Sequence, residues 1–372
     1  GTRKYDEGEL ADELETYAID LSGCAGMDDA EISAGCLTDQ VERAANLMAA
    51  VTLTPSFDSK EFEKLRKQTL TDLRVSSAEP FYLADREVRC RLYGEHPYAR
   101  TVKGEVEDVK ALTPEDLKAW WSTYARPDMA WLCFAGDIGL EQATQLAKNA
   151  LGSWKAEGPK PETALPPLPD SGPTHIYLVD KPGDQAQIRI ALPGITRDDP
   201  GYFTSRVVSS YFGGAFGSRL NDSLRVKKGL TYGANGGYSS QRMAGEFRIS
   251  TFTKLESTPE AIQTSLEEIR RLQTDPPTSE ELENTKAYTF GSFVGQRETP
   301  QSLDSDLWLI ESEGLTEDYF KKLLAGVQET NAEACSTLAQ RTLDTEKLVI
   351  AVVGPAEAIK ELLNDRGRKF QP

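Results

Sequence analysis

A proline-rich stretch interrupts the chain near its middle. Residues 156–173 contain six prolines. Each proline removes a backbone N–H donor and is incompatible with a helix interior, so this stretch predicts a stiff, extended linker. The chain has 372 residues, and we therefore expect two domains, over residues 1–155 and 174–372, each long enough to bury its own core.

The two segments on either side of the linker share one order of expected elements. In the first segment, the pattern predicts a helix over 113–124 and an apolar strand over 130–135, just before a glycine. In the second segment, the helix over 331–341 and the strand over 348–353 have the same spacing and also precede a glycine. At least five elements follow this common order, which indicates an internal duplication.

The second segment opens with elements that the first segment does not contain. Residues 176–180 and 186–192 flank a Pro-Gly-Asp turn and predict a β-hairpin, which a helix over 202–212 follows. The first segment begins only at the counterpart of about residue 211. We therefore expect the first domain, within the residues given, to be missing its first hairpin and helix, roughly forty residues.

Charge and hydropathy exclude some partners. Acidic residues outnumber basic ones by 59 to 42, which gives a net charge of −17 and argues against nucleic acid or an anionic membrane surface as a partner. The longest apolar runs, such as 131–135 and 348–353, are far shorter than the ~18 residues of a membrane span. We expect no nucleic-acid partner and no membrane span.

Cysteine and histidine are too sparse for an obvious metal site. The five cysteines are spread along the chain without a C-x-x-C pair, which favours reduced core residues. The two histidines, His96 and His175, lie far apart, and neither has a second histidine one helical turn away. A histidine metal site or a Ser-His-Asp triad would have to use one of these two residues.

One motif carries a family resemblance. Residues 217–232, GSRLNDSLRVKKGLTY, resemble the second-domain signature of the pitrilysin-like M16 zinc metallopeptidases, S-R-L-x-x-x-L-R-x-x-x-G-L-x-Y. The first segment resembles the same family at Gly1-Thr2, at LYGEHPY (92–98), at Gly104, at LTPEDL (112–117) and at YARPD (124–128). The resemblance extends over essentially the whole chain.

The resemblance implies a fold and an assembly. It implies an α+β chain of two homologous M16-type (LuxS/MPP-like) domains, each a mostly antiparallel sheet with helices packed on one face. Members of the family enclose peptides in a clamshell of four such domains. This chain would supply two of them, and a subunit or half that carries H-x-x-E-H would supply the others. The compartment stays open, with the bacterial periplasm or cytoplasm favoured over a membrane.

The family's zinc ligands do not map onto this chain. The resemblance implies zinc held by an inverted H-x-x-E-H and by a later glutamate, with the motif's glutamate as general base. The chain has no such motif, and Asp72 stands near the place of the later glutamate. Its carboxylate is about 1.5 Å closer to the backbone, which suits a fixed zinc site poorly, so a solvated helix-face carboxylate is the favoured interpretation. We expect this chain to bind no metal and the partner to hold the zinc.

Two further residues match the family pattern. The resemblance implies that Arg225 and Tyr232 close over the partner's zinc site, where the tyrosine hydroxyl donates to the substrate carbonyl as it becomes tetrahedral. A positioned O–H and a cation would then stabilise charge that exists only in the transition state. The alternative is structural: an arginine that satisfies helix carbonyls and a tyrosine whose ring packs in a core.

A glycine-rich stretch precedes this motif. Gly213, Gly214 and Gly217, with Ser218 and Arg219, are candidates for binding substrate, because glycine allows close backbone approach and mobility. A plain helix-ending turn explains the glycines equally well. The stretch lacks the G-x-x-x-x-G-K-[ST] pattern of a nucleotide loop.

These observations predict one function and leave two alternatives. The predicted function is that of an inactive partner subunit or half of an M16 zinc metallopeptidase, which encloses peptide substrates and supplies an Arg/Tyr pair to the partner's zinc site. One alternative is a truncated active peptidase whose motif lies upstream of residue 1. The other is a structural subunit without a peptidase role.

Overall fold

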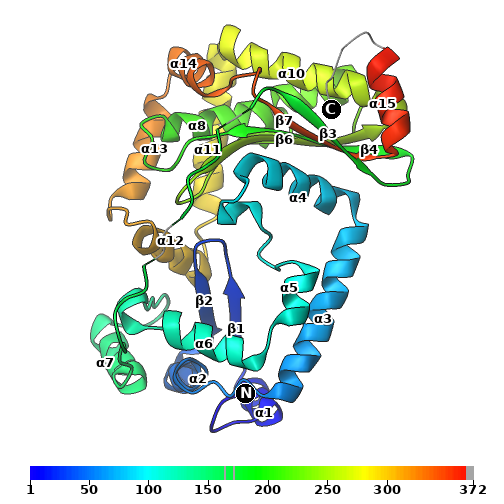
Figure 1. Cartoon of the computed structure of the whole chain (residues 1–372). Helices are drawn as coiled ribbons and strands as arrows, with labels where there is room; N and C mark the ends of the chain where they lie inside the picture. Colours follow the sequence, from blue (N-terminus) through cyan, green and yellow to red (C-terminus); the bar gives the residue numbers. More distant parts are fainter. Residues whose placement is uncertain (163–164, 171, 366–372) are drawn as a thin grey trace. The chain divides into compact units, whose positions relative to one another are not determined.

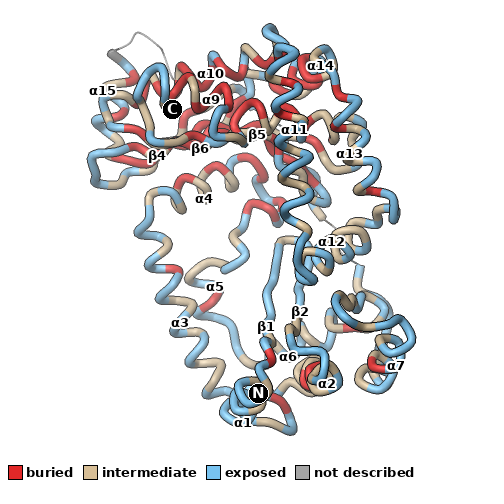
Figure 2. Tube along the Cα trace, turned by 180° about the vertical axis from the view of Figure 1, so that it is seen from behind, coloured by how far each residue is buried: buried red, intermediate tan, exposed pale blue. Residues whose placement is uncertain are grey.

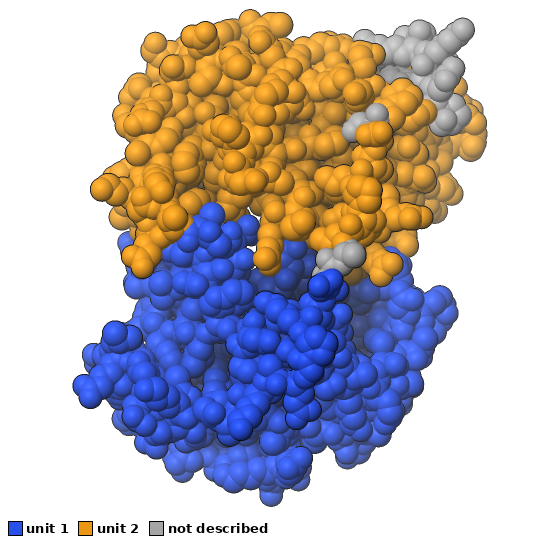
Figure 3. Space-filling model, turned by 60° about the vertical axis from the view of Figure 1, so that its left-hand side comes forward, with its two compact units in different colours: residues 1–74, 102–164, 297–315 blue, residues 75–101, 165–296, 316–372 orange. Residues whose placement is uncertain are grey.

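The computed structural model describes residues 1–162, 165–170 and 172–365. Contacts within it divide the chain into two compact units, which are coloured separately in Figure 3. Unit 1 comprises residues 1–74, 102–164 and 297–315. Unit 2 comprises residues 75–101, 165–296 and 316–372.

A mixed sheet forms the centre of unit 2 (Figure 1). Its strand order is β3-β7-β4-β6-β5; β3 and β7 run parallel, and the other neighbours run antiparallel. The strands are β3 (His175–Asp180), β4 (Gln185–Pro193), β5 (Ala234–Ser240), β6 (Gly245–Lys254) and β7 (Val349–Gly354). The apolar sequence of β7 suits its position between two strands, where nearly all of its residues are buried.

The strand pairing corrects one prediction. The two strands predicted as a β-hairpin over 176–192 both form, but they do not pair with each other. β7, from the end of the chain, lies between β3 and β4 and hydrogen-bonds to both. The hairpin prediction was wrong because β7 lies between the two strands. A buried strand needs a hydrogen-bonded neighbour along each of its edges, and β3 and β4 are the neighbours of β7.

Helices cover both faces of this sheet. In Figure 1, α8 and α10 lie on one side of the sheet and α4 lies on the other. The prediction of helices on one face of the sheet was therefore incomplete. Among the described residues, no helix combines the length and apolar character needed to cross a membrane. The helices of unit 2 are α4 (Pro80–Tyr93), α8 (Tyr202–Ser209), the short α9 (Arg219–Asn221), α10 (Thr258–Thr274), α11 (Ser279–Gly295), α13 (Tyr319–Glu329), α14 (Ala332–Thr342) and α15 (Ala356–Asp365).

The helix α4 is held on the sheet by packing and by an ion pair. Ala84, Val88 and Leu92 lie one turn apart on one side of the helix and are buried, and α4 contacts β4 and β7. Beside them, the buried Arg189 of β4 donates from Nε to Oδ1 of Asp85 at 2.7 Å. This side of α4 is therefore an integral part of the core of unit 2.

Unit 1 contains a smaller sheet. Its two strands, β1 (Asp20–Ala25) and β2 (Ala30–Gly35), pair antiparallel, and a small core lies beside them around Ile19, Ala44 and Leu47. The helices that lie in unit 1, entirely or for most of their length, are α1 (Glu7–Thr16), α2 (Val41–Leu53), α3 (Ser59–Ala78), α5 (Val106–Ala111), α6 (Pro114–Tyr124), α7 (Leu140–Leu151) and α12 (Pro300–Ser312).

The predicted strand over 130–135 does not form. These residues have no regular secondary structure and pair with no strand among the described residues, and the first three of them are exposed. Their counterpart in unit 2 is β7, whose two neighbours are β3 and β4. The counterparts of β3 and β4 are the elements expected to be missing from the first segment, so residues 130–135 have no partner for their backbone groups.

The compact units differ from the segments on either side of the linker. Residues 75–101 of the first segment belong to unit 2, and residues 297–315 of the second segment belong to unit 1. The two exchanged pieces contain α4 and α12, which occupy equivalent places in the common order of elements. The described part of the linker contains no helix or strand, and its residues 163–164 and 171 lie outside the described residues. The division into homologous domains at 156–173 stays a prediction.

Candidate functional site

The predicted site residues lie on one continuous part of unit 2, between α8 and β5. The helix α8 runs into a π-helical segment, η4 (Ser210–Gly214), and α9 runs into a second one, η5 (Asp222–Lys227). Gly213 and Gly214 belong to η4, and Arg225 belongs to η5. π-Helical turns are rare and frequently occur at functional sites, so their appearance at both places supports a site here.

The glycines of this stretch have different surroundings. A Cβ on Gly213 would lie 2.4 Å from the backbone nitrogen of Gly236 in β5, so packing alone requires glycine there. A Cβ on Gly214 would lie 3.0 Å from the carbonyl oxygen of Ser209. Gly217 is exposed, and a Cβ on it would meet open space. Packing therefore accounts for Gly213 and leaves Gly217 as the glycine that a substrate role can explain.

Arg219 is a buried clamp. Its side chain is 7% exposed, and it donates from Nε and Nη2 to the two carboxylate oxygens of Glu281 at 2.8 and 2.9 Å. It also donates to the carbonyl oxygens of Asp275 and Pro276 at 2.8 and 3.2 Å. These bonds tie the start of α9 to the start of α11. Arg219 thus positions the glycine-rich loop from inside the unit.

The carboxylate of Glu281 serves two purposes. It forms the capping box of α11 with Thr278, and it accepts the bidentate bonds of Arg219. The hydrogen bond from Arg219, above all, lowers the pKa of Glu281 to about 2. Because the folded pKa lies below the usual value, the stabilisation is complete above about pH 4.5 and is lost as the pH falls towards 2.

We expect Glu281→Gln to lower the free energy of unfolding of unit 2 by roughly 2 kcal/mol at pH 7, below the cost of breaking a fully buried pair because Glu281 is 34% exposed. The difference from the unchanged chain should shrink as the pH falls from about 4.5 to 2. The measurement is urea unfolding followed by hydrogen exchange of unit 2 peptides.

The matched control for this prediction is Glu283→Gln on the same helix. Glu283 is 71% exposed and lies 3.8 Å from Lys286, so its loss should change stability by less than about 0.5 kcal/mol. Equal effects of the two substitutions at pH 7 would contradict the assignment of Arg219 and Glu281 as a clamp.

Arg225 lies over an exposed aromatic ring. Its guanidinium carbon is 4.6 Å from the ring centroid of Phe216, which lies in the loop between the two π-helical segments and is 76% exposed. A cation over a ring face is held without losing its charge or all of its hydration. Phe216 has no role that the sequence predicts, because a single aromatic residue among glycines has no spacing pattern.

Tyr232 points outward from a well-fixed turn. The backbone N–H of Leu230 donates to Leu224 at 2.8 Å, and the hydroxyl of Thr253 donates to the carbonyl of Leu230 at 2.6 Å. Gly229 supplies the positive φ of +61° that this turn requires. The side chain of Tyr232 is nevertheless 83% exposed. The alternative in which this ring packs in a core is therefore wrong.

A cavity lies on the inner side of the same loop. It has a volume of about 300 Å³, and Ser218, which is 2% exposed, contributes to its wall. Six of the nine lining residues carry a side-chain hydroxyl or amide, most of the lining surface is apolar, and the one carboxylate is paired with Arg219. The cavity suits an uncharged group with both polar and apolar parts. Its lining residues are Ser210, Tyr211, Ala215, Gly217, Ser218, Glu281, Asn284, Thr285 and Tyr288.

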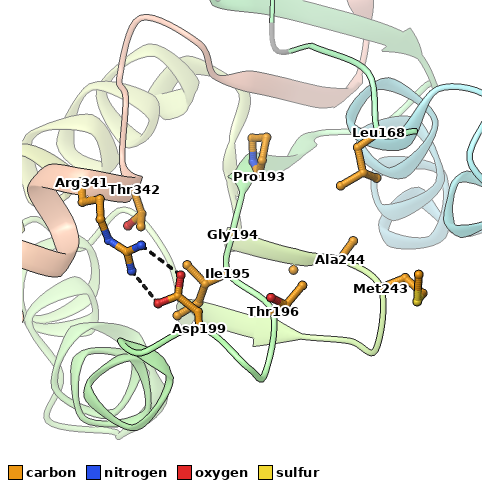
Figure 4. A pocket seen from close by; sticks show the side chains of 11 residues that line it. Leu168, Pro193, Gly194, Ile195, Thr196, Asp199, Met243, Ala244, Arg341 and Thr342 are labelled. Atoms are coloured by element: carbon orange, nitrogen blue, oxygen red, sulfur yellow. Dashed lines mark hydrogen bonds and ion pairs between the residues drawn. The ribbon is translucent and has the colours of Figure 1, made fainter. Parts of the chain in front are cut away.

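A second cavity, of about 360 Å³, lies elsewhere in unit 2 (Figure 4). Arg341 and Asp199 face each other in its wall with N···O distances of 2.6 and 2.9 Å. The hydrogen bond from Arg341 lowers the pKa of Asp199, so the two charges satisfy each other. None of the predicted site residues lines this cavity.

The described residues do not fit a zinc site. No group of three His, Cys, Asp or Glu side chains in residues 1–162, 165–170 and 172–365 could hold a metal ion. His96 is 3% exposed, and its Nδ1 accepts from the backbone N–H of Tyr98 at 3.2 Å. His175 lies in β3, and Asp72 is exposed on α3.

The described residues thus form an α+β fold in which an exposed tyrosine lies close in sequence to a glycine-rich loop. Residues 111–289 match the family model of the Peptidase M16 inactive domain. This match covers just under half of the chain and makes it similar to the M16 peptidase family.

Similar proteins and structures agree with this family. The Non-peptidase homolog YmxG of Helicobacter pylori is 23% identical over 95% of this chain and 81% of its own length. An uncharacterized zinc protease of Bacillus subtilis, also YmxG, is 22% identical over 96% of this chain and 86% of its own. The probable mitochondrial-processing peptidase subunit beta of Schizosaccharomyces pombe is 23% identical, over 57% of this chain and 47% of its own.

Solved structures share the fold. The crystal structure of a peptidase M16 inactive domain from Pseudomonas fluorescens superposes with a TM-score of 0.84 and 26% identity, over 95% of this chain and 85% of that one. A protease from Helicobacter pylori superposes with a TM-score of 0.87 and 15% identity, over 95% and 86%. The predicted α+β M16-type fold is thereby confirmed.

Proposed function

We propose that this chain is the non-catalytic partner, or half, of a zinc-bearing M16 peptidase that carries H-x-x-E-H. In this proposal it helps to enclose a peptide and supplies Arg225 and Tyr232 to the partner's zinc site. The observation that carries the proposal is the 83% exposure of Tyr232 on a turn whose backbone is fixed by hydrogen bonds. A fixed backbone that holds an exposed phenol in solvent suits a side chain that binds another molecule.

The chemistry of the proposal follows from where charge develops. Attack on a peptide carbonyl turns its oxygen into an oxyanion, and a hydroxyl donor already in place stabilises that charge without reorganisation. Zinc, when bound by the partner, polarises the carbonyl and activates water. Tyr232 would donate its phenolic proton as a hydrogen bond, and Arg225 would add a positive charge beside it.

The ring of Phe216 supports the role of Arg225. A free arginine side chain loses about 2 kcal/mol of conformational freedom when it is fixed. The ring under the guanidinium restricts that freedom before a substrate arrives, so less of it is lost on binding. Gly217 and the exposed side of the loop would lie along the bound peptide backbone.

The experiment that tests the proposal is peptide hydrolysis with three preparations in the presence of zinc: this chain, a H-x-x-E-H subunit from the same organism, and their mixture. We expect hydrolysis by the mixture at a rate at least about tenfold above the sum of the separate rates, and zinc-dependent activity only where the partner is present. Hydrolysis by this chain alone would overturn the proposal.

A structural subunit is the second candidate, because a relative that spans most of this chain is named a non-peptidase homolog. This candidate expects the mixture to form a complex, measured by light scattering, whose hydrolysis does not exceed that of the partner alone. Arg225 and Tyr232 could then be replaced together without effect on any activity of the complex. The same three preparations therefore separate the two candidates.

A further inference from the structure

One side of α11 borders the cavity that Ser218 helps to form. The helix is exposed along much of its length (Figure 2). Four of its residues line the cavity at successive spacings of three, one and three positions, which places them on one side of the helix. They are Glu281, Asn284, Thr285 and Tyr288.

The loop that contains Phe216 forms another part of the cavity wall. Ala215 and Gly217, the neighbours of Phe216 in the chain, both line the cavity. The guanidinium of Arg225 lies over the ring of Phe216, with 4.6 Å between the guanidinium carbon and the ring centroid. A peptide that contacts Arg225 and Gly217 would therefore pass beside the cavity.

The cavity has exposed lining residues at its opening and buried ones at its closed end. Gly217 and Asn284 are exposed, and Tyr288 is 55% exposed. Ser218 and Thr285 are 2% and 7% exposed. Pockets for whole small-molecule ligands measure about 300–1,000 Å³, so a cavity of about 300 Å³ suits a single side chain.

Two hydroxyl groups of the lining residues make no hydrogen bond within the described part of the chain. One is the hydroxyl of Thr285, and the other is the buried hydroxyl of Ser210. In contrast, Thr289, one turn after Thr285, donates from its hydroxyl to the carbonyl oxygen of Thr285 at 2.8 Å. Buried polar groups in proteins are nearly always paired, so this wall suits a ligand that supplies a hydrogen-bonding group.

The charges beside the cavity already satisfy each other. Glu281 is the one charged lining residue, and its two carboxylate oxygens accept from Arg219 at 2.8 and 2.9 Å. A ligand cation would have to compete with Arg219 for this carboxylate. A ligand anion would lie near the carboxylate without a cation of its own to pair with. The cavity therefore disfavours charged groups of either sign.

We propose that this cavity binds one uncharged side chain of a peptide that has an apolar stem and an amide tip, as glutamine has. Methylene groups of the stem pack on the apolar part of the wall, and the amide pairs with the hydroxyl of Thr285 and the amide of Asn284. Methionine has a similar length but leaves the hydroxyl unpaired, and glutamate brings an uncompensated charge. The peptide itself rests on the proposed function, whereas the side-chain preference can be measured without a partner.

The test uses this chain alone and three blocked amino acids: N-acetyl-glutamine amide and the matching derivatives of methionine and glutamic acid. Binding is titrated at pH 7 by saturation-transfer-difference NMR. We expect a Kd of about 1 mM for the glutamine probe, which is usual for a ligand of about 13 non-hydrogen atoms. The other two probes should bind at least about fivefold more weakly.

Three variants locate the binding. Thr285→Val keeps the size of the side chain and removes its hydroxyl, so the glutamine and methionine probes should then bind equally. The matched control is Thr289→Val on the same helix but outside the lining, and it should keep the preference for glutamine. Asn284→Ala changes an exposed residue, which leaves the buried wall intact, and should weaken binding of the glutamine probe about threefold.

Equal binding of the three probes would overturn the proposal, as would no binding of the glutamine probe at ten times the expected Kd. Unchanged binding of the glutamine probe in Thr285→Val or in Asn284→Ala would overturn it as well. The outcome is separate from that of the proposed function. A glutamine preference without hydrolysis by the mixture of subunits would keep the cavity as a binding site and refute the peptidase role, and hydrolysis without a preference would refute the binding site alone.

Discussion

Replacing Tyr232 by phenylalanine is expected to lower the kcat of the complex with the zinc-bearing partner by about 100- to 1000-fold. The substitution removes one hydroxyl, and a single donor to an oxyanion is worth this much in a site closed to water. KM should change by less than about threefold, because the donor acts on charge that the bound substrate does not yet have. The free energy of unfolding should not change, since the side chain is 83% exposed.

The matched control is Tyr124→Phe in α6 of unit 1. Tyr124 is 40% exposed, and its ring lies beside that of Trp120. The control substitution therefore also removes one hydroxyl group from an exposed tyrosine. We expect its kcat to equal that of the unchanged complex. A similar loss in both variants, or no loss in Tyr232→Phe, would remove Tyr232 from the reaction and favour the structural subunit.

Helices and their ends could be predicted from the sequence because their determinants are local. At the start of α6, a threonine precedes the proline at 114, and an acidic residue follows three positions after the threonine, which predicts a capped start. In the structure, Thr113 and Asp116 form a capping box. In the second segment the side-chain oxygen of Asn331 caps α14 by accepting from the backbone N–H of Ala334. Bonds of this kind join residues three positions apart, so the printed sequence already contains both partners.

Strand pairing could not be predicted in the same way because its partners are distant in the chain. Residues 130–135 and 348–353 have the same apolar pattern, yet only the second stretch lies in a sheet, as β7. β7 is a strand because β3 and β4 lie on its two sides. The pattern states which residues suit a buried strand, and the presence of neighbours decides whether one forms.

The burial of the candidate site residues could not be predicted from the sequence. The motif contains Arg219, Arg225 and Tyr232, but an arginine can be buried when it is paired and a tyrosine can be buried or exposed. Arg219 is buried against Glu281, a residue 62 positions away, and Tyr232 is exposed. Burial depends on contacts between distant segments, and the sequence does not reveal these contacts.

Gly213→Ala is expected to destabilise unit 2 by about 3 kcal/mol, near the upper end of the cost of overpacking. The new Cβ would lie 2.4 Å from the backbone nitrogen and 2.7 Å from the backbone oxygen of Gly236, and neither atom can move without shifting β5. The β-strand would have to move together with β6, to which it is paired over seven residues. The measurement is urea unfolding followed by hydrogen exchange of peptides over β5 and β6.

The comparison variant is Gly217→Ala, in the same loop. A Cβ at this position meets open space, so we expect the stability of unit 2 to change by less than about 0.5 kcal/mol. Its effect on peptide hydrolysis by the complex then reports on substrate binding alone, which a variant at Gly213 cannot do. If Gly213→Ala unfolded at the same urea concentration as Gly217→Ala, the close contact between η4 and β5 would be refuted. Gly213 is thus the glycine of this stretch that the fold requires, and Gly217 is one that remains free to serve the substrate.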